Sequence, residues 1–96
     1  MSRGRQGSGT DETDPQALHD ELAATAERPV ERSASRWLGE ADAIAGDVAH
    51  GGMSDDVRRE RLEQIEELLG HVDGTGDEQA DDHVEAARDL VADLLG

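Results

Sequence analysis

The sequence predicts an all-α fold, an antiparallel three-helix bundle with an additional short N-terminal helix. Apolar residues recur every three or four positions along the chain, which is the pattern of amphipathic helices. Signals for strands are nearly absent, because β-branched residues are sparse and only two prolines occur. With 96 residues and no Phe or Tyr, the chain can build only a small core of aliphatic side chains and alanine, which suits packed helices.

We expect one helical-bundle domain over residues 14–96, preceded by a disordered tail over residues 1–13. The tail is rich in Gly, Ser and charged residues, and such a composition buries too little apolar surface to order itself. No apolar run approaches the roughly 20 residues that span a bilayer, and the N-terminus lacks the apolar region of a signal peptide. These features predict a cytoplasmic protein.

The first helix is predicted over residues 15–28. Asp14 is a favourable N-cap, and Pro15 fits the first helical position because its missing N–H would be unpaired there in any case. The apolar pattern stops before Pro29, since the residue that precedes a proline is disfavoured in the α region.

The second helix is predicted over residues 29–50, with Ser33 as an alternative N-cap. Its apolar stripe includes Trp37, Leu38 and Ile44, which recur at helical spacing. Trp37 is the only aromatic residue of the chain, and we expect it to be a buried core anchor. Gly51 and Gly52 should end the helix, since glycine readily adopts the left-handed conformation that follows a helix.

A second stripe of this helix consists of small residues, which we call the small-residue face: Ser35, Gly39, Ala43 and Gly46. Each glycine inside a helix costs roughly 1 kcal/mol relative to alanine, and close approach of another backbone could offset that cost. This face is our candidate interaction face, to be covered by the N-terminal helix or by a second chain. The alternative is that the glycines merely reflect a composition rich in Gly and Ala.

Two further helices are predicted over residues 54–72 and 77–95. Ser54 provides an N-cap for the third helix, and acidic residues follow it where the helix dipole favours them. For the last helix, Thr75 could begin a capping box, and Asp77 is an equally good N-cap.

Charge is the strongest compositional signal. The chain has 24 acidic and 9 basic residues, a net charge of −15, and every basic residue is arginine. Such acidity argues against binding to nucleic acid or to anionic membranes. Self-repulsion of this size should loosen a small fold at low ionic strength and be screened in molar salt. Because the chain contains no cysteine, disulfides and thiolate metal sites are excluded.

Two segments, PVERSASRWLGEADAIAGD and HVDGTGDEQADDHVEAARDL, resemble small uncharacterised acidic proteins of haloarchaea, a domain of unknown function. The resemblance covers most of residues 15–95. It implies a halophilic source and a compact fold, and it brings no known activity, ligand or catalytic residue.

Two patterns could bind metal. Asp47 and His50 have the acidic-x-x-His spacing of di-iron bundles, but those sites need two such motifs. The pairs Glu63/Glu66 and Glu78/Asp81 resemble the ExxE and ExxD magnesium signature of all-α nucleotide pyrophosphohydrolases. The spacer is short for that family, and Glu63 should point to water. The remaining histidines include His19 and His83, which we expect to be exposed.

The sequence therefore favours a small, non-enzymatic protein that interacts with a protein partner or with itself as a homodimer. The core is too small for a buried active site, and no cofactor or small-molecule substrate is indicated. The alternative is a Mg²⁺-dependent nucleotide pyrophosphohydrolase-like enzyme that uses Glu63, Glu66, Glu78 and Asp81.

Overall fold

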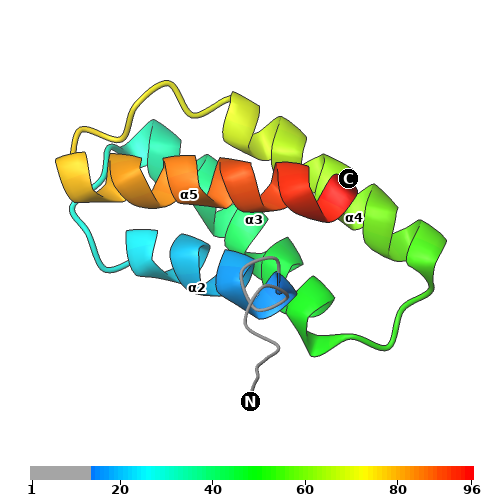
Figure 1. Ribbon diagram of the computed structural model, residues 1–96. Helices are drawn as coiled ribbons and strands as arrows, with labels where there is room; N and C mark the ends of the chain where they lie inside the picture. The colour runs from blue at the N-terminus through cyan, green and yellow to red at the C-terminus, as the bar shows by residue number, and fades with distance from the viewer. Residues whose placement is uncertain (1–13) are drawn as a thin grey trace, which may run out of the picture.

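The computed structural model describes residues 14–96, so the tail predicted for residues 1–13 lies outside the described residues. Within residues 14–96 the chain forms four α-helices and no strand. The helices are α2 (Pro15–Thr25), α3 (Arg32–His50), α4 (Asp55–Gly70) and α5 (Glu78–Leu95) (Figure 1). The predicted all-helical character is confirmed.

Each helix packs extensively against two others. Helix α2 contacts α3 and α5, α3 also contacts α4, and α4 contacts α5; in Figure 1 the short α2 lies beside α5. Leu18 and Leu22 of α2 are both fully buried, with 0 % of their surface exposed. The short N-terminal helix is thus an integral part of the core. The other large side chains of the core are Leu38, Val48, Leu62, Ile65, Leu69, Val72, Val84 and Val91.

Helix α2 begins where predicted and ends three residues early. The Asp14 side chain accepts a hydrogen bond from the Gln16 N–H at 2.9 Å, and Pro15 follows as the first helical residue. The helix ends at Thr25 rather than at residue 28, and the buried Thr25 hydroxyl donates back to the Leu22 carbonyl at 2.6 Å. Tight turns then carry the chain to Arg28, whose own N–H bonds to the Thr25 carbonyl at 3.1 Å.

Helix α3 begins at Arg32, so neither predicted start, Pro29 or Ser33, is right. The N-cap is Glu31, whose backbone is extended and whose side chain makes no capping bond. Instead, the Glu31 N–H donates to the Thr75 carbonyl at 2.7 Å. A contact with the α4–α5 connection therefore fixes the start of α3, and no local sequence pattern predicts that start.

The other boundaries lie close to the predictions, with α4 at 55–70 instead of 54–72 and α5 at 78–95 instead of 77–95. Ser54 accepts from the Val57 N–H at 3.3 Å as the expected N-cap. Asp77 caps α5 by accepting from the Ala80 N–H at 2.9 Å, so Asp77 rather than Thr75 is the N-cap. At the end of α4, Arg88 donates to the carbonyls of Leu69 and Val72, both at 2.8 Å.

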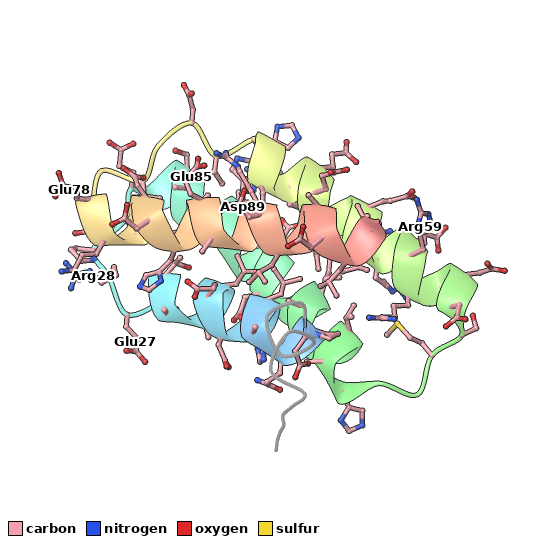
Figure 2. The ribbon with its side chains drawn as sticks, in the orientation of Figure 1. Glu27, Arg28, Arg59, Glu78, Glu85 and Asp89 are labelled. Carbon is pink, nitrogen blue, oxygen red and sulfur yellow. The ribbon has the colours of Figure 1, made fainter. Side chains whose placement is uncertain are left out.

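The connections α2–α3 and α4–α5 meet at one end of the molecule, around Thr75, which is fully buried. Its N–H donates to an Asp81 carboxylate oxygen at 2.8 Å, and its hydroxyl accepts from the Asp77 N–H at 3.1 Å. Figure 2 shows Arg28 and Glu78 at this same end and Arg59 at the far end.

Candidate functional site

Trp37 lies at the edge of the core and is half-buried, so the expected core anchor does not occupy its centre. The indole stacks on the imidazole of His71, with ring centroids 4.3 Å apart and planes 18° from parallel. The Arg36 guanidinium lies over the same indole, 5.4 Å from its centroid. Leu38, the next residue along α3, occupies the buried position instead, with 3 % of its surface exposed.

Beside Trp37 the surface is hollowed between α3 and α4, and we call this hollow the α3–α4 groove. The lining residues on the α3 side are spaced three and four apart, and three of the lining residues on the α4 side have the same spacing. Each set therefore follows one face of its helix. The residues that line the groove are Trp37, Glu40 and Ile44 from α3, Gln64, Glu67 and Leu68 from α4, and His71, the C-cap of α4.

The groove has an apolar floor and acidic rims. Trp37, Ile44 and Leu68 are each partly buried and pack against the core while keeping some surface exposed. Glu40 on α3 and Glu67 on α4 are exposed. No arginine is among the residues that line the groove. Sequence reasoning placed Trp37 and Ile44 on an apolar stripe, but it did not foresee that the stripe would remain open on its α4 side.

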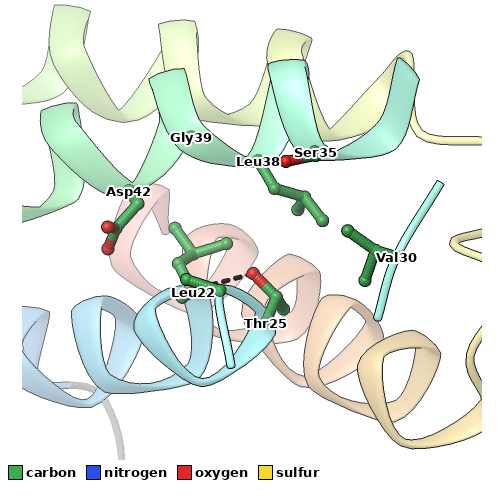
Figure 3. Close-up of a pocket in the computed structure, with 8 residues that line it drawn as sticks. Leu22, Thr25, Val30, Ser35, Leu38, Gly39 and Asp42 are labelled. Carbon is green, nitrogen blue, oxygen red and sulfur yellow. Dashed lines mark hydrogen bonds between the residues drawn. The ribbon is translucent and has the colours of Figure 1, made fainter. Parts of the chain in front are cut away.

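Half of the small-residue face borders a cavity of about 60 Å³ between α2 and α3. Ser35 and Gly39 line it from α3, and Figure 3 shows Leu22, Val30 and Leu38 pointing into the space beside them. Both Ser35 and Gly39 retain exposed surface. The cavity is large enough for a few water molecules.

The rest of the small-residue face is divided between a contact and open surface. A Cβ added to Gly46 would lie 3.3 Å from Nε2 of His19, so a side chain of α2 approaches this position. The expected close approach of another backbone is not found at Gly46 or at Gly39. Ala43 is exposed, and a Cβ added to Gly39 would meet nothing within 4 Å. Part of the face thus belongs to the α2–α3 contact, and contact with a second chain stays a prediction.

His19 and His83 are half-buried, which corrects the prediction that both are exposed. His83 Nδ1 lies 2.7 Å from Glu21 Oε1, and His19 Nε2 lies 3.2 Å from Asp42 Oδ1. That buried Asp42 oxygen nevertheless accepts no hydrogen bond, so the second pair is a close approach without an aligned bond. The first pair joins α2 to α5, and the second joins α2 to α3. The spacing of these residues in the sequence does not predict either pair.

The carboxylates of the magnesium-type signature are dispersed. Glu63, Glu66 and Glu78 are exposed, and Glu63 lies 3.7 Å from Arg59 Nε. Asp81 accepts bonds from the N–H and hydroxyl of Thr75, both at 2.8 Å, which is a structural role in the connection. Among the described residues, no group of three or more His, Cys, Asp or Glu side chains is placed to hold a metal ion.

The other candidate pair, Asp47 and His50, is exposed at the end of α3. His50 lies in the last turn, where the helix dipole favours a histidine. The exposed face of α5 carries further acids, and Figure 2 shows Glu85 and Asp89 along it. Acidic side chains therefore cover several surfaces without converging on one point.

An ion pair with two hydrogen bonds joins Arg28 in the α2–α3 connection to Asp77 in the α4–α5 connection. The guanidinium donates twice, through Nε at 2.9 Å and Nη2 at 3.0 Å. These bonds, together with the one from the Ala80 N–H, hold the pKa of the Asp77 carboxyl below its ordinary value of 3.8. The same pairing raises the pKa of Arg28. This geometry stabilises the fold and leaves no free oxygen pair for a ligand.

The fold and its surface thus define a small all-α domain with an apolar, acid-rimmed groove between two helices. The chain belongs to the family described as Domain of unknown function (DUF8152), whose model matches residues 14–96. No match was found among curated proteins or among solved structures. Of the helices in residues 14–96, none has the length and apolar character needed to cross a membrane.

Proposed function

We propose that this protein is a non-enzymatic interaction protein and that it binds a segment of another protein in the α3–α4 groove. The observation that carries the proposal is the position of Trp37, which is half-buried beside Ile44 and Leu68 in a surface hollow. Tryptophan is enriched among the residues that dominate binding energy at interfaces. An apolar groove between helices is a shape into which an amphipathic helix docks.

Another protein fits the groove better than a second copy of this chain. In a two-fold symmetric dimer the same patch faces itself, so Glu40 and Glu67 of one copy would approach those of the other. Like charges brought face to face cost affinity, and the net charge of −15 adds a general repulsion between copies.

Self-association through the small-residue face is the second candidate. It is favoured by Ala43 and Gly39, which are exposed next to each other on α3. A helix from a second chain could approach closely there because neither residue projects a large side chain. Native mass determination in high salt separates the candidates, since a dimer would support this face and a monomer would leave the groove proposal standing.

Binding in the groove is tested with a capped, alanine-based helical peptide that carries leucines at helical spacing and glutamines beside them. We expect the Trp37 fluorescence to change on titration, and Leu68→Gln to abolish the change. The matched control is Val57→Gln, because Val57 is also on α4, is 37 % exposed, and does not line the groove. Circular dichroism checks that each variant is folded. Equal binding by both variants would contradict the proposal.

The enzymatic alternative has its own test. Nucleoside triphosphate hydrolysis is measured in molar KCl with and without Mg²⁺. We expect no Mg²⁺-dependent turnover, because Glu66 and Glu78 lie exposed and Asp81 is engaged by Thr75. Mg²⁺-dependent hydrolysis by the parent protein that is lost in Glu66→Gln would overturn the proposal and support the hydrolase alternative.

We also infer a haloarchaeal, salt-rich cytoplasm as the setting and an antiparallel bundle as the arrangement of the helices. The acidic, lysine-free composition and the sequence resemblance support the setting. The short connections between successive helices support the arrangement, because short loops favour antiparallel neighbours.

A further inference from the structure

The rims of the α3–α4 groove have a consistent sign of charge. Glu40 lies on the α3 side and Glu67 on the α4 side, and both are exposed. A segment that occupies the groove would therefore pass between carboxylates contributed by two different helices. The seven lining residues include no arginine and one histidine, His71.

The arginines of the described chain that have assigned partners lie elsewhere. Arg28 is bound to Asp77, Arg59 pairs with Glu63 and donates to the Leu95 carbonyl, and Arg88 is bound to the end of α4. Arg36 lies next to the groove, with its guanidinium over the Trp37 indole. The negative face of an aromatic ring favours a guanidinium in that position.

We propose that the occupant of the α3–α4 groove is a cationic amphipathic helix of another protein, which deepens the function proposed above and rests on it. Its apolar side chains, one helical turn apart, would lie along Trp37, Ile44 and Leu68. Arginine or lysine side chains beside them would reach Glu40 on one rim and Glu67 on the other. Apolar contact supplies affinity, and the carboxylates select for cationic segments and against acidic ones.

The expected selectivity is modest because both carboxylates are exposed. Exposed ion pairs each contribute little, so two of them should tighten binding about 2- to 30-fold. Long-range attraction by the acidic surface should disappear in molar salt, where the Debye length is about 3 Å. The preference should therefore shrink with salt while binding of the apolar side chains remains.

The experiment compares three capped peptides that share their leucines and differ in the flanking residues, which are Arg, Gln or Glu. Each is titrated into the full chain, with Trp37 fluorescence as the readout. The rim is tested by the double variant Glu40→Gln/Glu67→Gln. The matched control is Glu60→Gln/Glu66→Gln, which removes the same charge from exposed positions of α4 that do not line the groove.

We expect the parent protein to bind the Arg peptide most tightly of the three. The rim variant should bind the Arg peptide only as tightly as the parent binds the Gln peptide, whereas the control variant should keep the affinity of the parent for the Arg peptide. Equal losses in both variants would overturn the inference by showing that net charge acts instead of the rim. Equal affinities for the Arg and Gln peptides would also overturn it and leave the proposed function intact. If no peptide binds, both the inference and the proposed function fall.

Discussion

The imidazole of His71 lies flat against the indole of Trp37, with the ring centroids 4.3 Å apart. His71 is the C-cap of α4, and Trp37 lies near the start of α3. The stack therefore joins the end of one helix to the beginning of another and closes one end of the α3–α4 groove. Because Trp37 is the only aromatic residue outside histidine, its fluorescence reports directly on this contact.

Replacing His71 by Ala should expose one face of Trp37. We expect the emission maximum of the folded parent to lie between those of buried and free tryptophan, and the variant to be quenched more strongly by acrylamide. Loss of the aromatic pair should lower the free energy of unfolding by about 0.5–1.5 kcal/mol. Unchanged quenching in a folded variant would show that the stack does not persist in solution.

Salt should stabilise the fold. The net charge of −15 produces self-repulsion that screening removes, so the melting temperature should rise by several degrees between low salt and molar KCl. Differential scanning calorimetry or far-ultraviolet circular dichroism would measure the change. The same melting temperature across the whole range would contradict the prediction.

The two glycines of the small-residue face should respond differently to alanine. Gly39→Ala places a methyl group in open space and should stabilise by about 0.5–1 kcal/mol through helix propensity. Gly46→Ala should gain less, because its Cβ would lie 3.3 Å from His19 Nε2 and the imidazole must shift. The measurement is denaturant unfolding of both variants.

Leucine at the same two positions distinguishes the two partners proposed for the small-residue face, which are α2 and a second chain. Gly46→Leu should lose stability by pushing α2 away, and the loss should not depend on protein concentration. A loss in Gly39→Leu that weakens as concentration rises would instead indicate a second chain. If both leucine variants melt at or above the parent temperature, the face is ordinary surface.

The Arg28–Asp77 pair should contribute to stability in a pH-dependent manner. The folded-state pKa of Asp77 lies below its ordinary value of 3.8, so the contribution is present above that value and is lost as pH falls through the folded pKa. Asp77→Asn keeps an N-cap acceptor and removes the charge. The parent should therefore exceed the variant in stability at pH 5–7, and the difference should vanish in strong acid.

Asp89→Asn is the matched control for net charge, since Asp89 is exposed on the same helix. The informative quantity is the difference between the two variants in the free energy of unfolding, followed by urea titration at each pH. A difference that grows as pH falls would have the opposite sign to the one expected and would contradict the assigned role of the pair.

The helix boundaries show what the sequence could predict. Asp14, Ser54 and Asp77 are N-caps whose side chains bond to N–H groups two or three residues ahead. A local pattern was sufficient to find Asp14 and Ser54, and it left Asp77 as one of two alternatives with Thr75. The start of α3 was wrong because Glu31 is fixed by the carbonyl of Thr75. That partner belongs to a different connection, and no periodicity links the two positions.

The candidate site was predictable only in part for the same reason. Helical spacing put Trp37 and Leu38 on one broad apolar stripe, but only the position of α4 decides that Leu38 is buried and Trp37 faces the groove. The pairing of His83 with Glu21 likewise depends on how α2 lies against α5. Contacts between helices carry this information, and the pattern within one helix does not.

The hydrogen bond from Glu31 to Thr75 has a consequence for how the chain tolerates a break. It joins the half that contains α2 and α3 to the half that contains α4 and α5, at the end of the molecule remote from the α3–α4 connection. That connection contains Gly51 and Gly52, which are exposed and have open space around them. Exposed glycine loops are favoured sites of proteolytic nicking and insertion. A chain cut there should keep its two halves associated, and separately produced halves should reassemble.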